Sequence, residues 1–140
     1  KKEIESFVSS KGLKNVLILP FQKQNLLNYS LNLPDVHLIT LRKGISPYAY
    51  PSKIYGVMAV GKPLIFIGEK TSEIFQFIES NKIGFSVENN DKTKLIQSIN
   101  LLKENPDLRK QISLKSRDIF IKNFDVSVAL NKWTEIIKMN

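Results

Sequence analysis

The spacing of apolar and polar residues along the chain alternates between strand-like and helix-like patterns. Two continuous apolar runs, VLILP at 16–20 and PLIFIG at 63–68, are typical of strands buried in a parallel sheet. VHLITL at 36–41 and the short GFSV at 84–87 have the same character. The pattern therefore predicts four strands.

Apolar residues at helical spacing fill the segments between these runs. The helical segments are 4–12, 25–33, 52–61, 71–81, 91–102, 105–121 and 128–139. Gly12 and Gly61 are suited to helix ends, and Asp91 to a helix start. Either Thr71 or Ser72 caps the fourth segment.

Strands that alternate with helices predict an α/β fold, a Rossmann-like parallel sheet with helices on both faces. At 140 residues the chain fits a single domain, 1–140. Because the pattern opens on a helix, we expect a first strand of the sheet to precede residue 1. The chain is then expected to be part of a larger protein.

The net charge is +8, and Arg42, Arg109 and Arg117 are the only arginines among the 21 basic residues. The lysines are scattered along the chain, and they are not accompanied by clustered arginines or by aromatic residues that could contact bases and phosphates. This pattern argues against nucleic-acid binding. The excess of positive charge reflects either a compositional bias or a role in attracting the chain to an anionic membrane surface. The chain has no cysteine, which excludes disulfides and thiolate metal sites. No apolar run is long enough to span a membrane.

Ligands of open parallel sheets bind at the carboxyl ends of the strands. Three predicted loops qualify: PFQKQN at 20–25, RKGISPYAYPSK at 42–53 and GEKTSE at 68–73. The second is the longest, and it runs into a helix start at Ser52 and Lys53. Free amides, the helix dipole and a lysine favour an anion there, and a diphosphate is the obvious one. The alternative is that Ser52 only caps the helix and Lys53 is only a surface residue.

Other candidates for chemistry are weak, so the catalytic residues stay unassigned. His37 alternates with apolar neighbours in a strand, which favours packing over catalysis. Without cysteine or a second histidine, no transition-metal site is expected. Glu73 falls in a helix first turn, where the dipole alone explains an acid. Tyr48 and Tyr50 either stack on a ligand ring or wall the loop against the sheet.

The run PSKIYGVMAVGKPLIFIG, with LPFQKQNLLNYSLNLPDVHLITL before it and SEIFQFIESNKIGFSVENND after it, resembles the C-terminal domain of glycosyltransferase family 4. MAVGKPLIFIG is the most specific part and is similar to the family's MAxGxPVI stretch. Among its branches, the chain most resembles the one of colanic acid, capsule and O-antigen synthesis, including fucosamine-type transferases.

The resemblance implies the donor-binding half of a GT-B fold, without a cofactor or metal. The donor would be a nucleotide sugar, linked to UDP or GDP. An N-terminal domain outside this chain would hold a saccharide or lipid-linked acceptor. The implied location is the cytoplasm, with a peripheral contact on the inner face of the membrane. We expect residues 1–140 to have no turnover alone, because catalysis needs both substrates held together.

The resemblance also implies which residues bind the donor. They are Pro20, Phe21, Gln22, Tyr48, Tyr50, Ser52, Lys53 and Gly56. The first three match the segment that meets the nucleobase, whereas Tyr50, Ser52 and Lys53 match the segment at the diphosphate. The family's Glu-x7-Glu pair falls on Tyr48 and Gly56, and neither position is glutamate. This departure leaves the ribose contact and the sugar identity unassigned.

Two other functions are compatible with the same fold. One is a nucleotide-sugar epimerase of GT-B fold, which needs acidic and histidine residues around a cleft. The other is a non-catalytic nucleotide-binding module or truncated relic. A glycosyltransferase half is expected to prefer UDP or GDP over ATP and NAD, so a nucleotide panel discriminates among these readings.

Overall fold

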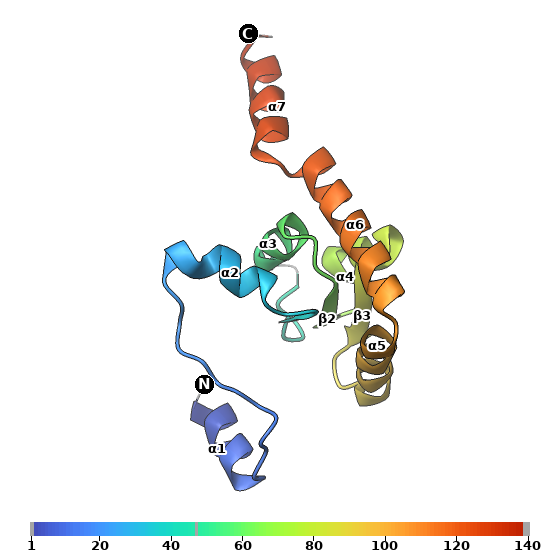
Figure 1. Cartoon of the computed structure of the whole chain (residues 1–140). Coiled ribbons are helices and arrows are strands. Elements are labelled where there is room, and N and C mark those ends of the chain that lie inside the picture. The colour runs from blue at the N-terminus through green and yellow to red at the C-terminus, as the bar shows by residue number, and fades with distance from the viewer. Residues whose placement is uncertain (1, 47, 139–140) are drawn as a thin grey trace.

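The computed structural model describes residues 2–46 and 48–138 and has an α/β architecture (Figure 1). Three parallel strands form one sheet in the order β1-β2-β3. They are β1 (His37–Thr40), β2 (Leu64–Gly68) and β3 (Gly84–Glu88). The predicted Rossmann-like sheet is confirmed, together with three of its four predicted strands.

Helices connect and flank the strands in the predicted alternation. They are α1 (Lys2–Ser10), a 3-10 turn η1 (Gln24–Leu26), α2 (Leu27–Asn32), α3 (Lys53–Ala59), α4 (Glu73–Asn81), α5 (Lys92–Glu104), α6 (Pro106–Asn123) and α7 (Val126–Lys138). Ser72 caps α4 by accepting a hydrogen bond from the Phe75 amide, and Asp91 caps α5 through the Lys94 amide. Local capping chemistry therefore sets both helix starts.

The central strand β2 is covered on both faces. Leu64 and Phe66 belong to a core cluster with residues of α3 and α4, whereas Ile65 packs with Leu102 of α5 and Ile112 of α6. Because neighbouring side chains of a strand point to opposite faces, this division places helices on both sides of the sheet. The arrangement is the predicted one.

Two polar contacts hold the sheet at its margins. His37 Nε2 lies 2.8 Å from the Leu31 carbonyl oxygen, which ties the start of β1 to α2. Glu79 of α4 accepts a hydrogen bond from the Ser86 amide at 2.9 Å, on β3. His37 is half-buried in its strand, as the alternating pattern predicted. Glu79 satisfies a backbone amide of the edge strand β3 that has no strand partner.

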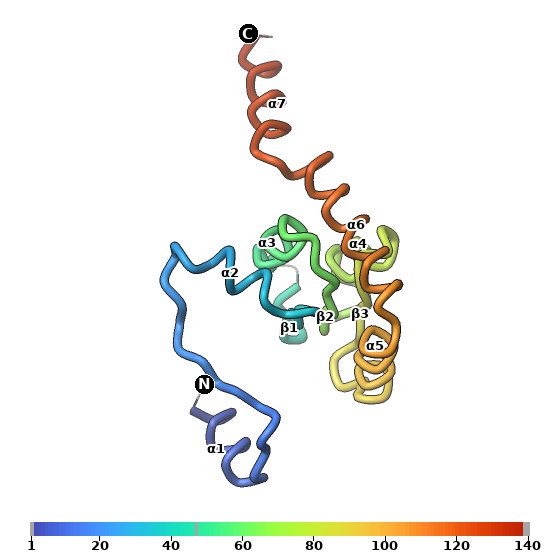
Figure 2. The backbone as a smooth tube through the Cα atoms, in the orientation of Figure 1, coloured from blue at the N-terminus to red at the C-terminus, as the bar shows by residue number. Residues whose placement is uncertain are grey.

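The predicted strand at 16–20 is wrong for the described chain. Residues 14–22 make no backbone–backbone hydrogen bond there, and Leu17 is 81% exposed. Figure 2 shows this segment running outside the sheet between α1 and α2. A strand exists only when its amides and carbonyls pair with a neighbour, and an apolar run does not reveal whether a neighbour is present.

Helices α1 and α7 are amphipathic, and neither has a buried residue. Figure 1 shows α7 extending beyond α6, away from the sheet. Its apolar side chains Leu130, Trp133 and Ile137 follow helical spacing and remain 60%, 64% and 68% exposed. Within the described residues, no helix has the length and apolarity needed to cross a bilayer.

Candidate donor pocket at the carboxyl edge of the sheet

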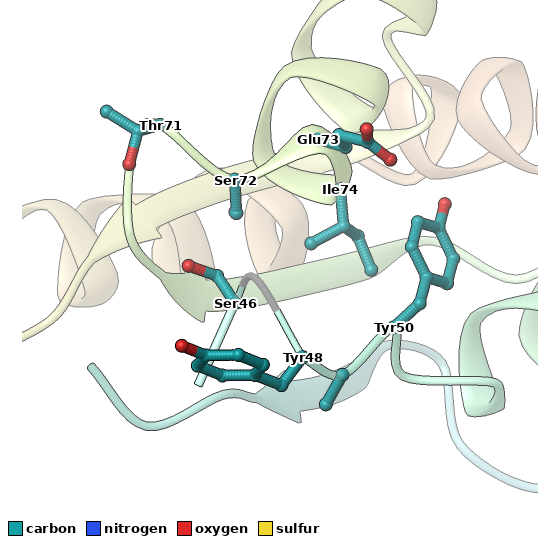
Figure 3. Close-up of a pocket in the computed structure, with 8 residues that line it drawn as sticks. Ser46, Tyr48, Tyr50, Thr71, Ser72, Glu73 and Ile74 are labelled. Carbon is teal, nitrogen blue, oxygen red and sulfur yellow. The ribbon is translucent and has the colours of Figure 1, made fainter. Parts of the chain in front are cut away.

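A pocket of about 510 Å³ opens where β1 and β2 end, which is the edge that parallel sheets use for ligands. Its volume falls in the range of small-molecule sites. The lining residues are Ser46, Tyr48, Ala49, Tyr50, Thr71, Ser72, Glu73 and Ile74. They come from the loop that follows β1, from the loop that follows β2 and from the first turn of α4 (Figure 3).

Aromatic rings form much of one wall. In Figure 3, Tyr48 lies across the pocket from Thr71, and the Tyr50 ring extends toward Glu73. Tyr48 is 89% exposed, whereas Tyr50 stacks on Tyr55 of α3 with ring centroids 5.8 Å apart. Tyr48 thus presents an open face that a sugar or base ring can contact.

Tyr50 is tied to the body of the fold through a chain of aromatic contacts. Tyr55 also contacts Phe124, at 5.0 Å between ring centroids. Partial burial, followed by the neighbouring Tyr55, raises the pKa of Tyr50 to about 12. Its hydroxyl is therefore protonated at neutral pH and can donate a hydrogen bond.

Two of the three aliphatic hydroxyls on the pocket wall already donate hydrogen bonds within the protein. Ser46 Oγ donates to Glu69 Oε2 at 2.5 Å, and Ser72 Oγ donates to the Glu69 carbonyl oxygen at 2.7 Å. Thr71 makes no hydrogen bond within the described part of the chain and is exposed. Thr71 is therefore the hydroxyl most available to a ligand.

Glu73 and Glu69 give this edge acidic character. Glu73 is the first residue of α4 and lines the pocket. Glu69, just after β2, has a lowered pKa, first because Ser46 donates to it and next because the Gly44 amide does. A carboxylate on the wall accepts hydrogen bonds from sugar hydroxyls but disfavours a phosphate beside it.

The predicted donor-binding residues occupy three places. Tyr48 and Tyr50 line the pocket. Ser52 and Lys53 are exposed at the start of α3, which is seven residues long, and Ser52 makes no side-chain cap. Gly56 lies within α3, where an added Cβ would be 3.3 Å from Leu31 Cδ1. Whether these residues bind a donor stays a prediction.

The predicted nucleobase segment Pro20, Phe21 and Gln22 does not line this pocket. It lies in the irregular stretch before η1, where Phe21 is fully exposed and the Gln22 side chain donates to the Pro20 carbonyl oxygen. Sequence reasoning missed the contribution of Thr71 and Ile74 to the pocket. The polar loop GEKTSE after a strand was the signal that pointed to this region.

The described residues contain no group of three His, Asp or Glu side chains able to hold a metal ion. His37 begins β1, so it lies at the end of that strand opposite to the pocket. The residues that line the pocket therefore offer tyrosine rings, hydroxyls and a carboxylate.

The chain is similar to two curated bacterial proteins. It is 31% identical over 111 residues to WbjE of Pseudomonas aeruginosa, named a probable glycosyltransferase, a match that spans 79% of this chain and 27% of WbjE. It is 29% identical over 80 residues to WcaI of Escherichia coli (strain K12), whose name assigns it to colanic acid biosynthesis as a glycosyl transferase. The chain is a relative of bacterial glycosyltransferases.

This relationship confirms the resemblance drawn from MAVGKPLIFIG and its flanks. The match with WcaI covers 57% of this chain and 20% of that protein. The chain thus spans between a fifth and about a quarter of the length of these glycosyltransferases. No family model matches it.

Proposed function

We propose that this chain is the donor-binding part of a glycosyltransferase that uses a nucleotide sugar, UDP- or GDP-linked, in surface-polysaccharide synthesis. The supporting observation is the pocket of about 510 Å³ at the carboxyl edge of a parallel sheet, in a relative of glycosyltransferases. Transfer of a sugar leaves charge on the departing diphosphate, which an enzyme must stabilise.

In this proposal the two ends of the donor meet different parts of the site. The sugar lies in the pocket, where Tyr48 offers a ring face and Glu73 and Thr71 offer polar partners for hydroxyls. The diphosphate lies toward the start of α3, where Lys53 supplies a positive charge. This division follows from charge, because an acidic wall suits hydroxyls and a lysine suits phosphate.

Nucleotide titration followed by NMR tests the proposal. We expect UDP or GDP to shift the backbone signals of Tyr48, Tyr50, Thr71 and Lys53, and to bind more tightly than ATP or NAD. Helix α6, none of whose residues lines the pocket, is expected to stay unshifted. Shifts confined to α6, or equal binding of all four nucleotides, would contradict the assignment.

The acceptor in this proposal is a saccharide or a lipid-linked saccharide, held by a part of the protein outside these 140 residues. The site of action is the cytoplasmic face of the membrane, and the net charge of +8 supports a peripheral contact with anionic lipid. We expect the chain to cosediment with anionic vesicles at low salt and to be released as salt rises. Equal sedimentation with neutral vesicles would contradict the charge-based contact.

A further inference from the structure

Glu69 joins the two loops that enclose the pocket. It follows β2 directly, and its Oε2 atom accepts hydrogen bonds from the Gly44 amide at 3.1 Å and from Ser46 Oγ at 2.5 Å. Gly44 and Ser46 belong to the loop that follows β1. One carboxylate oxygen thus connects segments that lie 25 and 23 residues away in the sequence.

The main chain of Glu69 is itself held in place. Its carbonyl oxygen accepts from the Ser72 amide at 3.0 Å and from Ser72 Oγ at 2.7 Å. Ser72 is buried and caps α4. The carboxylate therefore extends from a backbone that is anchored to the start of a helix.

The opposite loop has little else to hold it. Asn89 donates to the Leu41 carbonyl oxygen at 3.1 Å, which secures the base of the loop, and the Tyr50–Tyr55 stack secures its end. Residues 42–46 and 48–49 lie between these two anchors. Their only described hydrogen bonds to a segment outside the loop are the two that Glu69 accepts. The remaining ones are local, such as that from the Tyr48 amide to the Ile45 carbonyl oxygen at 2.9 Å.

The backbone of this loop is shaped to present its donors. Gly44 has a φ of +80°, a left-handed conformation that glycine adopts without strain, and its amide points to the carboxylate. Hydrogen bonds to an ionised acceptor are stronger than neutral ones. The lowered pKa of Glu69 agrees with an ionised carboxylate that is stabilised by these two donors.

We propose that Glu69 is a positioning residue that fixes the separation of the two pocket walls, with Ser46, Tyr48 and Tyr50 on one wall and Thr71 and Ile74 on the other. Glu69 does not line the pocket, so it acts through the loop and not by touching the ligand. Its effect on donor binding rests on the proposed function, whereas its effect on the loop does not.

The test compares Glu69→Ala, Glu69→Gln and the control Glu104→Ala in the 140-residue chain. Glu104 is an exposed acid at the end of α5, far from the loop in sequence. Calorimetric titration with UDP and GDP is expected to show binding about three- to tenfold weaker for Glu69→Ala. Glutamine keeps an acceptor oxygen at the same reach, so Glu69→Gln is expected to restore most of the affinity. Thermal midpoints of Glu69→Ala and the control are expected to agree within about 3 °C, because an exposed interaction contributes little to global stability.

A second measurement needs no ligand. Amide hydrogen exchange at Gly44 and across residues 44–46 is expected to be faster in Glu69→Ala, near wild-type in Glu69→Gln and unchanged in Glu104→Ala. If the wild-type chain binds neither nucleotide, the proposed function fails and exchange alone decides the role of Glu69. Unchanged exchange in Glu69→Ala would overturn the proposal, as would unchanged affinity in a chain that binds the nucleotide.

Discussion

Gly84→Ala is expected to lower the free energy of unfolding by about 3 kcal/mol or more. Gly84 begins β3 and is the register partner of Leu64 on the central strand β2. A Cβ at this position would collide with the Leu64 carbonyl oxygen and lie 2.9 Å from its carbonyl carbon. A backbone carbonyl in a paired strand cannot rotate away, so the two strands would have to separate. Urea denaturation followed by far-UV circular dichroism measures the loss.

Gly56→Ala is the matched control for that loss. Its Cβ would be 3.3 Å from Leu31 Cδ1, the end of a flexible side chain. Alanine also favours a helix interior over glycine by about 1 kcal/mol. We therefore expect Gly56→Ala to be neutral or slightly stabilising. Equal midpoints for both variants would show that β2 and β3 do not pair in the register described.

Lys53→Ala is expected to weaken binding of a nucleoside diphosphate about ten- to a hundredfold, equivalent to roughly 1.5–3 kcal/mol. Lys53 is the exposed first residue of α3, three residues after Tyr50 on the pocket wall. The physical reason is the loss of a charge-assisted contact to phosphate. The difference in affinity between the variant and the wild type is expected to shrink at high salt, because ions screen that contact. Calorimetric titration at two salt concentrations measures both.

The control is Lys92→Ala, because Lys92 is likewise the exposed first residue of a helix, α5. It has the same charge and the same position relative to a helix dipole. Residues 89–91 before it do not line the pocket, whereas Tyr50 before Lys53 does. Both variants are expected to change stability by less than about 0.5 kcal/mol. If Lys53→Ala binds as wild-type does, Lys53 is only a surface residue of α3 and the phosphate lies elsewhere.

Much of the fold could be read from local chemistry. The capping residues Ser72 and Asp91 predicted where two helices begin. The short apolar runs predicted the strands β1, β2 and β3. The strand prediction for VLILP was wrong because a strand needs a neighbouring strand to pair with. The composition of one segment does not show whether such a neighbour is present. The amphipathic spacing of α7 likewise predicted a helix but not that its apolar side would be exposed.

The candidate site was predictable in outline only. The rule that ligands lie at the carboxyl edge of a parallel sheet directed attention to the loops at 42–53 and 68–73, and the pocket is lined by both. The Glu69 contacts were not predictable, since no local pattern tells an acid after one strand that it will accept from an amide 25 residues earlier. The argument that placed residues 20–22 at a strand end fell with the strand at 16–20, so their prediction now rests on the family resemblance.

The exposed position of Trp133 decides what fluorescence can report about this protein. It is the single tryptophan of the chain, and it lies on α7, outside both core clusters. Its emission is therefore that of a solvated indole in the folded chain and is a poor signal for melting of the sheet. The same property makes it a label-free sensor of burial, because a partner, lipid or another protein segment that covers α7 would shift its emission to the blue while the core stays unchanged.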